Sequence, residues 1–260
     1  MMKPFAVVGL FALALLTSAS SQAEEVRIDT SAYRHALAAA LSSPDSPCGA
    51  IPRRVADAFA SALPEEVVKE ESRFAGGEAL EAIGWNIHFD SMPVPWDTTR
   101  QVWAFYTTTQ HSGLVTILER QGDTVRYKAQ RGKLETLMMP IVHIGSGKLL
   151  GIDGTVITAT GFWGAKMRRG KEILSWDGAT CDRITPCDVY PGTGFCDNYL
   201  NGRKWSEREV DGDGVLEILV SPDNDRGERE KIVEPVVIFK YDKASRRFVR
   251  FPTREAPQEK

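Results

Sequence analysis

The stretch Trp85-Asn86-Ile87-His88-Phe89-Asp90 decides the fold class of most of the chain. In an extended strand, Trp85, Ile87 and Phe89 share one face, and His88 and Asp90 share the other. This period of two is typical of a half-buried β-strand. Similar segments recur to the C-terminus, so we expect a mainly β fold over residues 83–260. The expected architecture is an antiparallel β-sheet assembly, partly propeller-like or sandwich-like.

The expected strands follow the alternating and apolar runs of this region. They lie at 83–89, 101–108, 114–120, 124–128, 156–160, 172–176, 216–220, 236–241 and 248–251.

The apolar residues before this region repeat with a helical period instead. Two stripes have i, i+4 spacing: Tyr33, Leu37 and Leu41, then Val55, Phe59 and Leu63. Pro52 suits the first position of the second helix. We therefore expect a small helical N-terminal region over residues 24–82, in which 64–82 forms either a third helix or a linker.

The first 23 residues have the pattern of a secretory signal peptide. Lys3 precedes a short apolar run, and Ser21-Gln22-Ala23 supplies small residues at a cleavage site. We expect a periplasmic or secreted protein with no transmembrane segment after the signal is removed. Loss of Lys3 moves the net charge from −3 to about −4, which argues against nucleic acid as a partner.

Four cysteines suggest disulfide bonds in an exported chain: Cys48, Cys181, Cys187 and Cys196. Three pairings are open. The turn-rich stretch between Cys187 and Cys196 favours joining those two, which leaves Cys48 with Cys181. A zinc site is the alternative, but the chain has no Cys-x-x-Cys and no histidine near these cysteines.

The segment 209–217, Glu-Val-Asp-Gly-Asp-Gly-Val-Leu-Glu, has the pattern of a cation-binding loop. The expected metal-binding residues are Glu209, Asp211, Asp213, Val215 and Glu217. Calcium prefers six to eight oxygen ligands, and the two intervening glycines permit the tight backbone that wraps an ion. A regular EF-hand is excluded because its twelfth position is Val220, not glutamate. The competing interpretation is a polar turn between two strands.

This loop, followed directly by a strand, resembles the calcium loops of FG-GAP and VCBS-type repeats. The later hairpin Phe239-Lys240-Tyr241-Asp242 with Phe248 is similar to the aromatic hairpin that accompanies them. The resemblance covers one short motif and one hairpin, and it implies a calcium site in an extracellular β protein. Glu209 stands where the family usually has aspartate. A full propeller needs four or more blades, and this chain is short for that.

Few residues suggest catalysis. His88 and Asp90 form a candidate pair that would activate a serine, and Ser146 is the serine to consider. Ser146 lacks the Gly-x-Ser-x-Gly elbow of serine hydrolases. A secreted hydrolase acting on glycans or esters is therefore the alternative function.

The expected function is non-catalytic binding of a macromolecule. The partner would be another exported protein, and the chain would act as an inhibitor of an exported enzyme or toxin. Six tryptophans are candidates for interface anchors, with Trp96 and Trp205 the most exposed. A structural envelope protein is the second alternative.

Overall fold

The computed structural model of this 260-residue chain describes most of the region after the predicted signal peptide. The described residues are 29–47, 49–74, 86–163, 167–189, 196–222 and 236–251. The signal segment, Cys48 and Trp85 lie outside them.

Three helices open the described chain: α1 (Thr30–Leu41), α2 (Arg53–Ala62) and α3 (Glu65–Phe74). The Asp29 side chain caps α1 by accepting hydrogen bonds from the backbone N–H groups of Ser31 and Ala32. Both predicted apolar stripes are buried throughout. The open question over residues 64–82 is answered by α3, which forms the first part of that segment as a helix.

Three four-stranded sheets follow, and each is an antiparallel meander of consecutive strands. Sheet one contains β1 (Ile87–Val94), β2 (Asp97–Thr108), β3 (Gly113–Gln121) and β4 (Thr124–Leu134). Sheet two contains β5 (Met138–Ser146), β6 (Thr155–Trp163), β7 (Arg168–Trp176) and β8 (Cys181–Arg183). Sheet three contains β11 (Arg203–Arg208), β12 (Glu217–Pro222), β13 (Val237–Asp242) and β14 (Arg247–Phe251). The 3-10 turn η1 (Gly147–Leu150) follows β5, and β9 (Cys187–Val189) pairs with β10 (Cys196–Asn198). The predicted mainly β, antiparallel fold class is confirmed.

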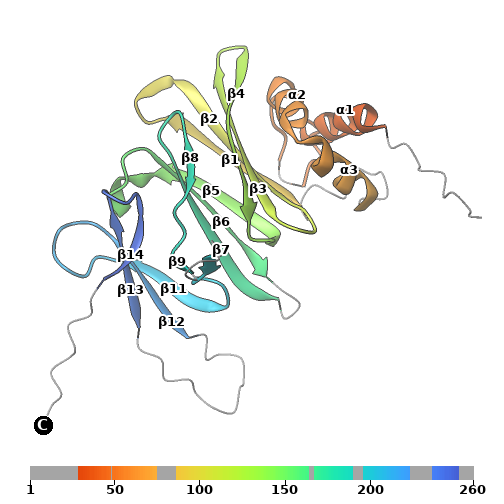
Figure 1. Ribbon diagram of the computed structural model, residues 1–260. Coiled ribbons are helices and arrows are strands. Elements are labelled where there is room, and N and C mark those ends of the chain that lie inside the picture. Colours follow the sequence, from red (N-terminus) through yellow and green to blue (C-terminus); the bar gives the residue numbers. More distant parts are fainter. Residues whose placement is uncertain are drawn as a thin grey trace, which may run out of the picture.

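The helices and the three sheets are stacked as successive layers (Figure 1). The first apolar core joins the helices to sheet one, where the Phe59 and Phe105 rings stack with centroids 4.1 Å apart. The second core lies between sheets one and two, and the third between sheets two and three. Removal of this apolar surface from water is the main force holding the layers together.

The stacking explains why the alternating pattern weakens in the middle of the chain. Sheet one is covered on both faces, so every residue from Val102 to Thr108 is buried. Strands buried on both faces have continuous apolar runs rather than alternation. Five strands were not predicted: β5, the three-residue strands β8, β9 and β10, and β11. β5 contains Pro140 and Gly145, and β11 is mostly charged, so their pairing with β6 and β12 is not visible in their own residues.

The cysteines only partly follow the predicted framework. Cys181 has a free, buried thiol, so the prediction that pairs it with Cys48 is wrong. Burial in the second core raises the pKa of this thiol to about 12. Cys187 is part of a disulfide bond. Cys48 and the side chain of Cys196 lie outside the described residues, so the pairing of Cys187 with Cys196 stays a prediction.

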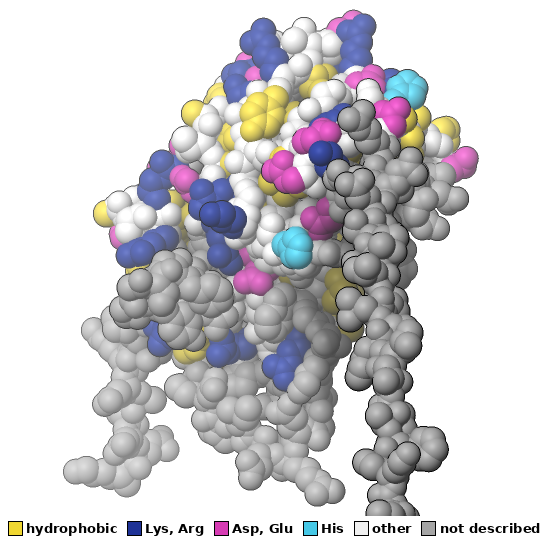
Figure 2. Space-filling view, turned by 45° about the vertical axis from the view of Figure 1, so that its right-hand side comes forward, with side chains coloured by type: hydrophobic (Ala, Val, Ile, Leu, Met, Phe, Trp, Pro, Cys, Tyr) yellow, Lys and Arg dark blue, Asp and Glu magenta, His cyan; other side chains and the backbone are white. Residues whose placement is uncertain are grey.

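Among the described helices, none has the length and hydrophobicity to cross a bilayer. Figure 2 shows basic and acidic side chains interspersed over the face it presents, with hydrophobic side chains in small separate patches.

Candidate metal-binding loop and adjoining cavity

The 209–217 loop connects β11 to β12 and gathers three of the predicted carboxylates. One oxygen each from Glu209, Asp211 and Asp213 lies within 4.8 Å of the others, on the protein surface. Gly212 and Gly214 have φ angles of +86° and +79°, the left-handed backbone that glycine accepts without strain. Ligands on opposite sides of a calcium ion are about 4.6–5.2 Å apart, so the spacing of these oxygens fits that ion.

Glu217 is the last acidic residue of the loop and the first residue of β12. Unlike the three surface acids, its carboxylate is fully buried. Its Oε2 accepts a hydrogen bond of 2.9 Å from the Val210 backbone N–H. Its Oε1 has no hydrogen-bond partner among the described residues. A buried carboxylate oxygen without a donor costs free energy, so Glu217 has a reason to attract a cation. Val215, the fifth predicted ligand, donates its backbone N–H to Asp213 Oδ1 at 2.9 Å and so helps to orient that carboxylate.

A lysine that the sequence did not suggest as part of the site lies at its centre. Lys240 Nζ is 2.5 Å from Asp211 Oδ2 and 2.5 Å from Asp213 Oδ2, and 3.4 Å from Glu217 Oε1. These carboxylates raise the pKa of Lys240, and the hydrogen bond from Lys240 lowers the pKa of Asp213. Lys240 belongs to β13, and the register Ile218↔Phe239 brings it beside the loop.

The Lys240 ammonium therefore acts as the counter-ion of the acidic loop. It supplies one positive charge to three carboxylates at the distances above. A divalent cation would bring twice that charge and direct coordination bonds. The residues fit calcium on donor type and spacing, provided that the flexible lysine side chain moves aside.

A cavity of about 470 Å³ adjoins this loop. It is bounded by Trp96, Ser146, Lys148, Asp153, Val215 and Lys243, among others. Leu216 ties the loop to the cavity wall because its N–H donates to the Leu149 carbonyl at 2.7 Å. The side chain of Val215 packs against Gly151, whose φ of +70° ends η1. The conformation of the acidic loop thus sets one wall of the cavity.

Trp96 is the exposed aromatic residue of this cavity, with 48% of its surface accessible. Its ring tilts against that of buried Trp176, with centroids 5.7 Å apart, and lies over Gly178. A Cβ at Gly178 would sit 3.0 Å from the Trp96 ring, so glycine leaves room for it. Trp205, also expected at the surface, is instead half-buried against the third core.

The candidate catalytic residues His88, Asp90 and Ser146 have other partners. The Val142 N–H donates to His88 Nδ1 at 3.2 Å, and the Ile144 N–H donates to Asp90 Oδ2 at 2.9 Å. These side chains thus satisfy the backbone of β5 and join sheets one and two. Burial lowers the pKa of His88.

Two further contacts also differ from those of a catalytic triad. His143, not His88, has its Nδ1 3.3 Å from Asp90 Oδ2. Ser146 Oγ accepts a hydrogen bond from the Lys148 N–H and so caps η1. A triad requires the histidine to contact both the serine and the acid, and these contacts connect other pairs.

Comparison with known proteins adds no family to this picture. No family model, curated protein or solved structure matches the chain significantly. The likeness to FG-GAP and VCBS-type repeats stays a resemblance of the 209–217 loop.

Proposed function

We propose that the 209–217 loop binds calcium, and that the protein is an exported, non-catalytic binding protein whose contact face centres on Trp96. The observation that carries the proposal is the buried carboxylate of Glu217. Its Oε1 accepts no hydrogen bond from the described residues, lies below a surface cluster of three further acids and is 3.4 Å from the Lys240 ammonium that Asp211 and Asp213 also contact. A turn that served only to connect two strands would not need a buried carboxylate beneath it.

Calcium would influence binding through the cavity wall. Replacement of Lys240 by a divalent ion would tighten the loop, and the loop positions Val215 in the wall of the Trp96 cavity. Pre-ordered surfaces bind more tightly because less conformational entropy is lost in the complex.

The partner we infer is another exported macromolecule, with inhibition of an exported enzyme or toxin as the leading mode. Trp96 supports this inference because a half-exposed tryptophan fixed by Trp176 is a suitable anchor. Lys148, Asp153 and Lys243 around it supply the polar rim that protein interfaces commonly have.

The calcium part is tested by isothermal titration of the mature protein with calcium. We expect one site in the wild-type chain and its loss in the double variant D211N/D213N. The matched control is D45N/D153N, which removes the same charge from exposed positions outside the loop. Equal calcium binding by both double variants, or no binding by the wild type, would overturn the assignment.

The partner is tested by affinity capture from periplasmic extract, in calcium and again in chelator. We expect one stoichiometric protein that is retained in calcium, released in chelator and lost with Trp96→Ala. Tyr127→Ala is the control, since Tyr127 is similarly exposed, at 54%, on β4 away from the cavity. Unchanged capture by the Trp96 variant would remove this face from the interface. Turnover of a glycan or ester substrate would favour the hydrolase instead.

A further inference from the structure

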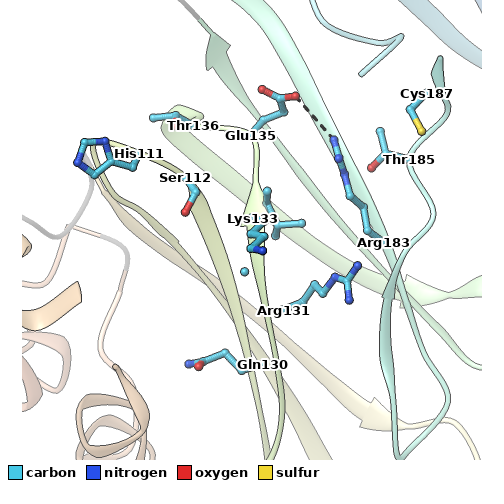
Figure 3. A pocket seen from close by; sticks show the side chains of 12 residues that line it. His111, Ser112, Gln130, Arg131, Lys133, Glu135, Thr136, Arg183, Thr185 and Cys187 are labelled. Carbon is cyan, nitrogen blue, oxygen red and sulfur yellow. Dashed lines mark ion pairs between the residues drawn. The ribbon is translucent and has the colours of Figure 1, made fainter. Parts of the chain in front are cut away.

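A second and larger cavity lies at the opposite end of the strands from Trp96. β2 begins beside Trp96 and ends at Thr108, next to the turn that carries His111 and Ser112. Both residues line a cavity of about 1020 Å³ between β4 and the segment that follows β8 (Figure 3). The cavity is therefore separate from the proposed calcium loop and from the Trp96 face.

The charged lining of this cavity is mainly basic. Arg131 and Lys133 of β4 and Arg183 of β8 face one acidic side chain, Glu135. Among the described residues, neither Arg131 nor Lys133 has an acidic partner within ion-pair distance. A chain with a net charge of −3 thus keeps two uncompensated cations in one concave site. Such a concentration of charge favours an anionic ligand.

Arg183 is held in place by a buried partner. Its Nε and Nη2 donate to Glu172 at 3.0 and 2.9 Å, and Glu172 is fully buried. Nη2 also lies 3.7 Å from Glu135 Oε1. This two-point contact fixes the plane of the guanidinium at the cavity edge, where Figure 3 shows it beside Glu135 and Thr185.

The wall that carries Glu135 is also fixed from beneath. The Glu135 N–H donates to Glu172 Oε1 at 2.9 Å, and its carbonyl accepts from the Tyr106 hydroxyl. Gly113 lies under this contact, where a Cβ would come within 2.1 Å of the Tyr106 oxygen. A wall fixed in this way needs little reorganisation when a ligand binds.

The backbone at Lys133 is strained. Its φ of +59° lies in the left-handed region, which a non-glycine residue adopts only at a cost in free energy. A glycine adopts this conformation without strain, but here the left-handed residue is Lys133 and not its neighbour Gly132. Strained residues gather at functional sites, and this one carries a cation that lines the cavity.

We propose that this cavity binds an anionic ligand that carries two or more carboxylate or phosphate groups. Arg131, Lys133 and Arg183 would contact the charged groups, and the hydroxyls of Ser112 and Thr136 would donate hydrogen bonds. A volume of about 1020 Å³ has room for an organic anion much larger than phosphate.

The probes are pyrophosphate and citrate, titrated separately into the full mature chain at low and at physiological ionic strength. We expect one site, with the tighter probe showing whether phosphate or carboxylate is preferred. The variant R131Q/K133Q should weaken binding about tenfold or more, because two charge-assisted contacts are lost.

The matched control is R126Q/R53Q, which removes the same charge from exposed residues outside the cavity. We expect its affinity to remain within about twofold of wild type, since exposed charges away from the site are screened. Lys133→Gly is a second test that relieves the backbone strain and so preserves folding. No binding of either probe to the wild type would overturn the proposal. Equal weakening by both double variants would do so as well, because it would mean non-specific attraction to the positive charge of the protein surface rather than to the cavity.

Discussion

Glu172 in sheet two and Glu217 in sheet three are both fully buried, yet the protein treats their carboxylates differently. Both oxygens of Glu172 are used: Arg183 binds both, Thr185 Oγ1 donates to Oε2, and the Glu135 N–H donates to Oε1. Glu217 has one backbone hydrogen bond and one oxygen without a donor among the described residues. The cation that contacts it within the described part of the chain, Lys240, is shared with two aspartates.

The difference separates a structural carboxylate from one that is suited to a ligand. A buried charge needs donors or an opposite charge, or else the group tends to become neutral. At Glu172 the fold supplies all of this internally. At Glu217 one carboxylate oxygen lacks a hydrogen-bond donor among the described residues. This oxygen lies next to an exposed cluster of acids that could bind a cation together with it.

Glu71 of α3 shows a third outcome, in which the hydrogen bonds and charges around a buried carboxylate do not fully compensate for its burial. It is buried in the helical layer, and Asn86 Nδ2 donates to its Oε2 at 3.2 Å. Burial raises the pKa of Glu71 to about 7, although the Asn86 hydrogen bond opposes the shift. This carboxyl group therefore takes up a proton as the pH falls through about 7, well above the range in which an exposed glutamate does so.

The largest effect is expected from Glu172→Ala. Removing this carboxylate leaves the Arg183 guanidinium and the Glu135 N–H without their buried acceptor. We expect the free energy of unfolding in urea to fall by about 3–5 kcal/mol. Glu65→Ala is the control, because Glu65 is exposed, solvent screens its pairing with Arg34, and its loss should cost far less stability. Similar losses in both variants would mean that the Glu172 network is not a structural centre.

A smaller, pH-dependent effect is expected from Glu71→Gln. The folded-state pKa of about 7 exceeds the usual value of 4.5, so the folded protein binds the extra proton between these limits. Wild-type stability should therefore fall as the pH rises through this window, by roughly 3 kcal/mol, and level off above it. The glutamine variant should lack this decline and be the more stable protein at about pH 8.

The check for Glu71 is urea unfolding across the pH range, with Glu66→Gln as the exposed control on the same helix. Parallel pH profiles for wild type and Glu71→Gln would show that this group does not account for the decline.

The smallest effect on folding, and the sharpest test of Glu217, is expected from Lys240→Met. Without its ammonium, the loop keeps four carboxylates with no internal cation, so the calcium-free protein should melt at a lower temperature. Calcium no longer has to displace a lysine, and its affinity should rise about tenfold. Lys243→Met is the control on the same hairpin, since the ion pair of Lys243 is with highly exposed Asp153, at 3.7 Å. Weaker calcium binding in Lys240→Met would show that the lysine supports the site rather than competing for it.

The local features of this protein were predictable from its sequence. The helix stripes, the mainly β class and the clustering of Glu209, Asp211 and Asp213 involve residues close in the chain. Their geometry follows from periodicity and from the conformational freedom of glycine. Trp96, which lies between Pro95 and Asp97, was likewise expected at the surface. The strands that the sequence did not predict include β5 and β11. Their pairing depends on neighbouring strands rather than on their own residues.

The tertiary structure alone decided which distant residues meet. Lys240 reaches the acidic loop through the register of β12 with β13, and Arg183 meets Glu172 through the pairing of β7 with β8. The basic cavity needs sheets one and two to stack, and that stacking also buries the free thiol of Cys181. Sequence spacing encodes the local conformation of the chain. Layer packing and strand register are set by the total apolar surface that all parts of the chain bury together. A local sequence pattern does not contain this information.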